Sequence, residues 1–131
     1  MTKKTGIKPT DAELLIMQAL WQHKHLTVHE VLETVGSNRN WGYTTVLKLM
    51  QIMTKKELVG RDTSKQTHVY WAKVSQQETR KGILNHVIDG VFGRSSGNLV
   101  LQALNERKVS QQELAEIKKL IDQLEDEGDS S

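Results

Sequence analysis

The sequence predicts a mainly α-helical protein, in which an N-terminal winged helix-turn-helix with a small β-hairpin wing precedes a C-terminal helical region. Three helical apolar patterns in the first 57 residues are followed by two short β-prone runs, which is the element order of a winged helix-turn-helix. Helical spacing of apolar residues then returns. We therefore expect a winged-helix DNA-binding domain at 1–74 and a helical dimerisation domain at 75–131.

The charge of the chain is divided unevenly along its 131 residues. Residues 1–74 have a net charge of +5 and residues 75–131 a net charge of −3, although the whole chain has only +2. The basic front half is the part expected to face a polyanion. The absence of cysteine excludes disulfides and favours a reducing cytoplasm. The basic N-terminus lacks the apolar run of a secretory signal, and no stretch is apolar enough to predict a membrane span.

Two helices are expected to begin at capping boxes, in which a Thr and a Glu three residues later satisfy each other's backbone N–H groups. The two boxes are Thr10 with Glu13 and Thr27 with Glu30. The first predicts a helix at about 10–22. The second predicts a helix that ends near Gly36, with a short strand at 26–27 before it.

The third helix is predicted at about 42–57, within the stretch "NWGYTTVLKLMQIMTKKELV". On a helical wheel its residues separate into an apolar side and a polar side. The apolar side consists of Val46, Leu49, Met50 and Met53. The polar side consists of Thr44, Lys48, Gln51 and Lys55. No Asp or Glu occurs in the stretch before Glu57, so the polar side has hydrogen-bonding and cationic groups but no carboxylate.

An acid-free helix face is typical of a surface that reads DNA, because phosphates repel carboxylates while Thr, Lys and Gln can reach phosphates and base edges. The residues expected to contact bases are Tyr43, Thr44, Thr45 and Lys48, with Gln51 as a further candidate. Those expected near the DNA backbone are Lys55 and Lys56 on the helix, Arg39 and Asn40 in the preceding turn, Arg61 and Lys65 in the wing, and Lys3, Lys4 and Lys8 before the first helix.

Other interpretations of these residues remain open at this point. The polar side of the third helix could be a solvated face that happens to lack acids, and a winged helix could bind a protein instead of DNA. The three neighbouring histidines His23, His25 and His29 are weak candidates for a metal site, which would make the protein a metal- or ligand-responsive regulator. We expect His23 and His25 to lie in a surface turn and His29 on the exposed side of the second helix, so no metal or other cofactor is predicted. No phosphate-binding loop, carboxylate pair or activated nucleophile is recognisable, and no enzymatic activity is expected.

The back half predicts three short helices, two of which begin at the capping sequence "SQQE". Such helices bury little apolar surface by themselves, so we expect them to pack against a second copy in a two-fold homodimer. The apolar residues expected in that interface are Leu84, Val87, Ile88, Val91, Leu99, Leu114, Ile117, Ile121 and Leu124.

Several of these segments resemble the penicillinase-repressor family of transcriptional regulators over about residues 7–124. The segments are "PTDAELLIMQALW", "LTVHEVLE", "WGYTTVLKLMQIMTKKELV" and "HVYWAKVSQQE". Their most specific parts are the pattern formed by Trp41, Thr45, Val46 and Leu49, and the His-x-Tyr at 68–70. The resemblance implies a bacterial, cytoplasmic homodimeric repressor that binds a pseudo-palindromic operator. Many members of the family have a membrane-bound zinc-protease sensor as a partner, and the resemblance implies a similar partner here.

The sequence departs from the family at two places that concern release from DNA. The best-known members are cut at an Asn–Phe bond within a run like "LVLNFA", whereas this chain has "LVLQAL", with Gln102–Ala103 in place of that pair. The copper-responsive branch carries C-terminal cysteines, and this chain has none. The resemblance therefore implies a repressor whose releasing signal is not visible in the sequence.

Overall fold

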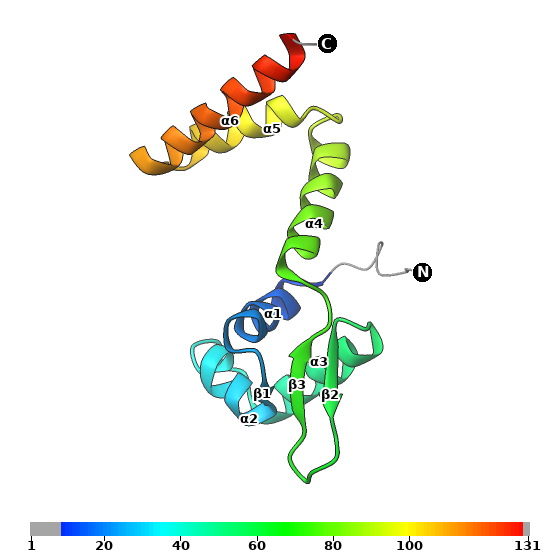
Figure 1. Ribbon diagram of the computed structural model, residues 1–131. Coiled ribbons are helices and arrows are strands. Elements are labelled where there is room, and N and C mark those ends of the chain that lie inside the picture. Colours follow the sequence, from blue (N-terminus) through cyan, green and yellow to red (C-terminus); the bar gives the residue numbers. More distant parts are fainter. Residues whose placement is uncertain (1–8, 130–131) are drawn as a thin grey trace. The chain divides into compact units, whose positions relative to one another are not determined.

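A computed structural model describes residues 9–129, so Lys3, Lys4 and Lys8 lie outside the described residues. The protein is mainly helical with one small antiparallel sheet, as the sequence predicts (Figure 1). The chain divides into two compact units, one up to His86 and one from Val87 on. This division falls inside a helix, and the domain boundary expected between 74 and 75 stays a prediction.

Helix α1, Asp11–His23, begins at the first predicted capping box. Glu13 N donates to Thr10 Oγ1 at 3.2 Å, and Thr10 N donates to Glu13 Oε1 at 2.9 Å. The face of α1 with the least exposure carries Ile16, Met17 and Leu20, all at 1% or below. Helix α1 is therefore fixed in the core by its central turn.

Strand β1, Leu26–Thr27, leads directly into α2, Val28–Val31, which is capped by the second predicted box. The helix then widens into a π-helical turn, η1, Leu32–Gly36. Gly36 has no left-handed backbone, but it lies close to its neighbours: a Cβ there would be 2.9 Å from Leu32 Cδ1 and 3.2 Å from Trp41 Cβ, so these side chains would have to shift. The left-handed residue is Asn40, at φ 58°, in the turn that follows.

Helix α3, Tyr43–Lys55, ends two residues earlier than predicted, and Glu57 then reverses the chain with φ 66°. Strands β2, Val59–Asp62, and β3, Val69–Ala72, form the predicted hairpin. The sheet order is β1-β3-β2, so Tyr70 of β3 pairs with Leu26 on one side and with Arg61 on the other. Tyr70 is only 1% exposed, and it closes the core from the sheet side.

The core of the first unit is built from all of these elements. Its buried members are Ile16, Met17, Ala19, Leu20, Leu26, Val28, Val31, Val35, Val46, Met50, Met53, Leu58, Val59, Tyr70 and Val74. Trp21 and Trp41 pack against this cluster, and Trp21 Nε1 also donates to the Val74 carbonyl at 2.9 Å.

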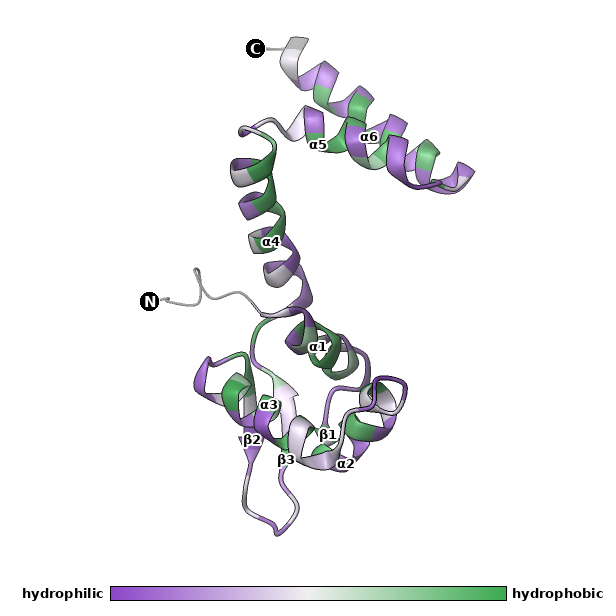
Figure 2. Ribbon diagram, turned by 180° about the vertical axis from the view of Figure 1, so that it is seen from behind, coloured by the Kyte–Doolittle hydropathy of each residue, from purple (hydrophilic) through white to green (hydrophobic). Residues whose placement is uncertain are grey.

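The remaining helices are α4, Gln76–Val91, α5, Ser96–Glu106, and α6, Gln111–Asp129. A serine cap precedes each one, and Figure 2 shows hydrophobic segments recurring among hydrophilic ones along all three helices. In the described part of the chain, none of these helices contains a buried side chain. No helix within 9–129 is long and apolar enough to cross a bilayer.

Candidate nucleic-acid interface

Helix α3 presents two sharply different faces, as the helical wheel predicts. Val46, Met50 and Met53 are fully buried, which fixes the rotation of the helix about its axis. The opposite face is exposed along its length and carries Thr44, Lys48, Gln51 and Lys55. At the first turn Tyr43 is 43% exposed, and Thr45 is also exposed. Because α3 contains no acidic residue, this face offers only neutral hydrogen-bonding groups and cations.

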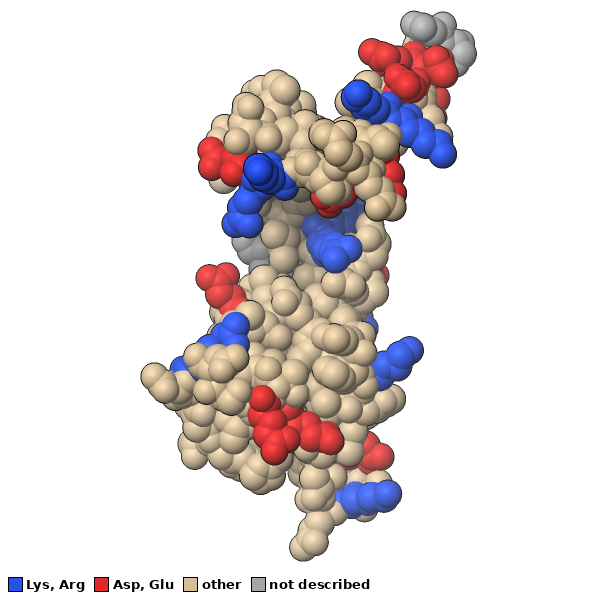
Figure 3. Space-filling view, turned by 90° about the vertical axis from the view of Figure 1, so that its left-hand side faces the viewer, with Lys and Arg blue, Asp and Glu red and all other residues tan. Residues whose placement is uncertain are grey.

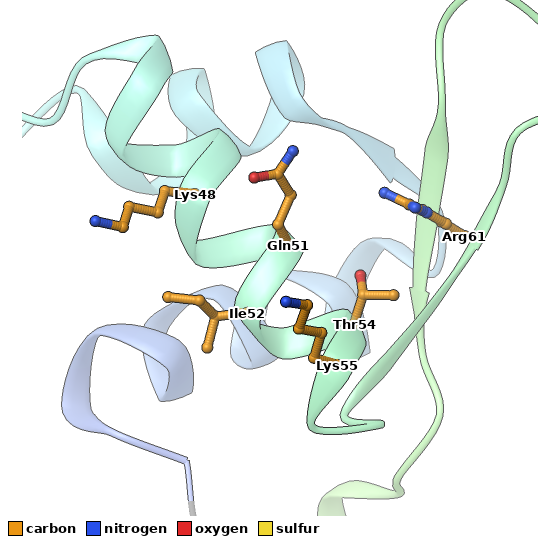
Figure 4. A pocket seen from close by; sticks show the side chains of 6 residues that line it. All are labelled: Lys48, Gln51, Ile52, Thr54, Lys55 and Arg61. Atoms are coloured by element: carbon orange, nitrogen blue, oxygen red, sulfur yellow. The ribbon is translucent and has the colours of Figure 1, made fainter.

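A groove of about 420 Å³ lies between α3 and β2 (Figure 4). Its lining residues are Lys48, Gln51, Ile52, Thr54, Lys55 and Arg61. Figure 4 shows the Arg61 side chain reaching from β2 toward α3, so that cations stand on both sides of the groove. Thr54 donates its hydroxyl to the Met50 carbonyl at 2.8 Å, and it therefore contributes mainly its methyl group to the groove. A groove with cationic walls, apolar parts and no carboxylate matches a sugar-phosphate backbone.

The loop residues expected near DNA are exposed, but their side chains differ in freedom. Arg39 Nη1 donates to the Val35 carbonyl at 2.7 Å, which ties part of the guanidinium to the end of η1. Asn40 follows it in the left-handed conformation. Lys65 lies in the exposed connection between β2 and β3. The structure thus gathers Lys48, Gln51, Lys55 and Arg61 around one groove, whereas Arg39, Asn40 and Lys65 lie outside its lining.

Strand β2 ends in an acidic residue, Asp62, close to the cations of the wing. Asp62 accepts a hydrogen bond from Ser64 N at 2.9 Å. Hydrogen bonds from Ser64 lower the pKa of the Asp62 carboxyl, and the charges of Lys65 and His68 lower it further. The wing therefore carries an ionised carboxylate beside its cations.

Lys56 does not belong to the exposed basic face, contrary to the expectation that it contacts the DNA backbone. Its Nζ lies 2.9 Å and 3.1 Å from the two carboxylate oxygens of Glu13, which is only 2% exposed. The pair joins the first turn of α1 to the C-terminal end of α3. Because the half-buried Lys56 ammonium neutralises the buried Glu13 carboxylate, Lys56 serves to hold α3 against α1.

The three candidate histidines do not form a cluster. His25 lies against Trp71, with ring centroids 6.0 Å apart, and His29 lies against Tyr43, with centroids 4.8 Å apart. Within residues 9–129, no group of three or more His, Asp or Glu side chains could hold a metal ion. The His29–Tyr43 contact adds His29 to the surface around the first turn of α3. No pattern in the sequence predicts this contact, because it depends on how α2 packs against α3.

Acidic side chains occur in quantity elsewhere on the molecule. Figure 3 shows one acidic group beside the C-terminal end of α6, where the chain reads Glu125, Asp126 and Glu127, and another on the first unit. A polyanion would be repelled from that end and attracted to α3 and the wing. Charge, burial and groove geometry therefore converge on one candidate interface for a nucleic acid.

Comparison with known proteins agrees with this geometry. The family model described as penicillinase repressor matches residues 9–123. The methicillin resistance regulatory protein MecI of Mammaliicoccus sciuri is 21% identical over 112 residues, which cover 86% of this chain and 91% of that protein. The penicillinase repressor of Bacillus licheniformis is 18% identical over 114 residues, which cover 87% of this chain and 89% of that protein.

Among solved structures, the DNA-binding domain of the repressor BlaI superposes with a TM-score of 0.50 at 23% identity. The match covers 60% of this chain and 93% of that domain. It confirms the winged helix-turn-helix predicted from the order of the elements.

Proposed function

Since the model of the penicillinase repressor family matches most of its length, this chain belongs to that family, and we propose that it is a homodimeric repressor that binds a pseudo-palindromic operator. The family is one of transcriptional repressors, which confirms that the chain is not an enzyme. The observation that carries the proposal is the exposed, acid-free face of α3 beside a groove with cations on both walls.

In this proposal α3 enters the major groove, and its first turns approach the base edges. Thr44, Thr45 and Lys48 are exposed there and can donate or accept hydrogen bonds. Tyr43, held against His29, offers an aromatic edge or its hydroxyl group. Gln51 lies one turn beyond Lys48, where it can reach the next bases or a phosphate.

The phosphate backbone would lie along the groove between α3 and β2. Lys55 and Arg61 stand on its two sides, and Lys65 extends the positive charge to the wing tip. Each neutralised phosphate releases counterions, so affinity should fall steeply as salt rises.

The exposed apolar side chains of the C-terminal helices support a homodimer. Within residues 9–129, six of the nine exposed large hydrophobic residues occur from Val91 on, and Leu101 is 63% exposed. Of the predicted interface residues, Leu84, Val91, Ile121 and Leu124 are exposed, and Val87, Ile88, Leu99, Leu114 and Ile117 are half-buried. A second copy that covers these faces would place two α3 helices about one or two helical turns apart on DNA.

Release from DNA would differ from that of the best-known family members. Gln102 and Ala103 lie in the middle of α5, and Gln102 Nε2 donates to Glu106 Oε2 at 2.8 Å. A zinc-protease sensor of the kind implied by the family resemblance would therefore have to recognise a residue pair other than Asn–Phe.

The proposal is tested by fluorescence anisotropy with a duplex from the upstream region of the chain's own gene and an unrelated duplex, each at two salt concentrations. Lys48→Ala should weaken binding to the upstream duplex by about 5- to 100-fold and reduce the preference over the unrelated duplex. Lys65→Ala should weaken both duplexes equally and reduce the salt slope by about 0.9.

Lys81→Ala, which removes an exposed cation from α4, is the matched control and should leave both affinities unchanged. Wild-type protein that binds neither duplex at low salt would contradict the proposal and favour a protein-interaction module.

A further inference from the structure

A second groove of about 420 Å³ lies on the first unit and shares no residue with the groove beside α3. Its lining comes from the end of α1, the connection to β1, and the central strand β3. The lining residues are Leu20, Trp21, Lys24, His25, Trp71 and Ala72. It therefore combines two indoles, an imidazole and an ammonium group, and it contains no carboxylate.

The two indoles are held in place before any ligand arrives. The Trp21 ring is fixed by its hydrogen bond to the Val74 carbonyl and by packing on the core. Trp71 pairs across the sheet with Gly60, and its ring occupies the space above that glycine, since a Cβ at Gly60 would lie 2.8 Å from Trp71 Cε2. Preformed aromatic walls reduce the ordering cost of binding a flat molecule.

The cation in the groove sits at a strained point of the backbone. Lys24 has φ 73° and ψ −57°, and His25 N donates to the His23 carbonyl at 2.9 Å, which together define a γ-turn of the rare, strained kind. Backbone strain of this kind concentrates at ligand sites. Among residues 9–129, neither ion pair between side chains involves Lys24, so its ammonium has no carboxylate partner there.

From these contacts we propose that the groove binds a small planar aromatic carboxylate. The ring would lie against the indoles of Trp21 and Trp71, and the carboxylate would meet the Lys24 ammonium, with His25 as a further donor. The volume is in the range of small-ligand pockets, about 300–1,000 Å³, and it is small for a folded partner. The proposal does not depend on DNA binding, because the two grooves are separate.

The test uses the full chain, and it follows the indole N–H signals of its three tryptophans by NMR while benzoate is added. The Trp71 and Trp21 signals should shift together and saturate below about 10 mM. Trp41, which lies outside the groove, should not move. Benzyl alcohol should bind more weakly, and acetate should produce no saturable shift.

Two variants separate the two parts of the proposed site. Lys24→Gln should weaken benzoate about two- to fivefold and leave benzyl alcohol unchanged. Trp71→Leu should weaken both aromatic probes about tenfold, and an unchanged Trp41 signal would show that the fold is intact. Lys81→Gln, the matched control on α4, should behave as the wild type.

Four outcomes would overturn the proposal. These are a shift that does not saturate, an equal response of Trp41, an equal response to acetate, and a stronger response to single-stranded oligothymidine, which would assign the groove to nucleic acid.

Discussion

Residues 9–74 and the helices α4 to α6 are both rich in well-capped helix, yet only residues 9–74 contain a core. Fifteen apolar residues are buried around Tyr70 in the first unit. In α4, α5 and α6, by contrast, no described side chain is buried, and Val91 is 73% exposed. Capping and periodicity specify a helix locally, whereas burial requires a second surface.

This difference in burial indicates that the exposed residues of the two regions have different partners. In the first unit, α1, the sheet and Lys56 hold α3 with one face out, so its exposed residues are free for a ligand. In the C-terminal helices the exposed residues are themselves apolar, and water is a poor partner for them. The exposed apolar surface of the C-terminal helices predicts a second copy of the chain as its partner. The polar, acid-free surface of α3 predicts DNA.

The largest expected effect comes from adding charge to the apolar face of α6. Ile121→Glu with Leu124→Glu would place carboxylates where we propose that two copies meet. We expect monomers in sedimentation velocity. Operator affinity should fall by about 10²- to 10⁴-fold, because the second half-site no longer binds as part of one molecule.

Gln112→Glu with Gln123→Glu adds the same charge at exposed polar positions of α6 and should leave the dimer intact. A doubly substituted Ile121/Leu124 protein that still sediments as a dimer would place the interface elsewhere.

A substitution that creates a cavity in the first unit should lower the stability of that unit, whereas a substitution on α6 should not. Met50→Ala removes a fully buried side chain and should lower the free energy of unfolding by about 2–5 kcal/mol. All three tryptophans lie in the first unit, so urea unfolding followed by their fluorescence measures this unit.

Leu124 is 57% exposed, and Leu124→Ala should weaken the dimer. At low protein concentration it should leave the urea midpoint of the fluorescence transition unchanged. An equal loss in both variants would mean that the two regions unfold as one cooperative core.

Local signals in the sequence were sufficient for most of the fold. Both threonine capping boxes, the two-residue strand at Leu26 and the outward face of α3 depend on residues within a few positions of each other, and the structure confirms them. For the candidate site, the same local periodicity identified Lys48, Gln51 and Lys55 as exposed. Their contact with DNA stays a prediction.

Contacts between distant residues could not be predicted in this way. Glu13 and Lys56 are 43 positions apart, and a helical wheel cannot show that an apparent surface lysine neutralises a buried carboxylate. From the sequence, Gly60 is only a glycine that should destabilise a strand. The structure shows that the Trp71 ring lies above it. Each depends on how elements pack, which one sequence without relatives does not reveal.

The neighbouring lysines at the end of α3 should therefore respond differently to the same substitution. Lys56→Met leaves the buried Glu13 carboxylate without its partner, and we expect a loss of about 1–2 kcal/mol in the free energy of unfolding. Lys55→Met should change stability by less than about 0.5 kcal/mol.

For DNA binding, the Lys55 substitution should have the larger effect and the Lys56 substitution the smaller one. The salt slope should fall by about 0.9 for Lys55→Met and stay unchanged for Lys56→Met. If the two variants showed the same stability and the same slope, the separation of a structural lysine from a DNA-facing one would be wrong.

The smallest expected effect concerns the single carboxylate of the wing strand. Asp62→Asn removes a negative charge beside Arg61 and Lys65, and we expect every duplex to bind about two- to threefold more tightly at low salt, with little difference at high salt. Because Ser64 and the nearby cations lower the pKa of Asp62, the wild-type carboxylate stays ionised from neutral pH down to below its ordinary pKa. The difference between the two proteins should therefore be constant at pH 6–8 and should vanish only as the pH falls through the lowered pKa, where the wild type becomes neutral. Anisotropy titrations at pH 6, 7 and 8 measure it, and an affinity that is unchanged at low salt would place the wing away from the phosphates.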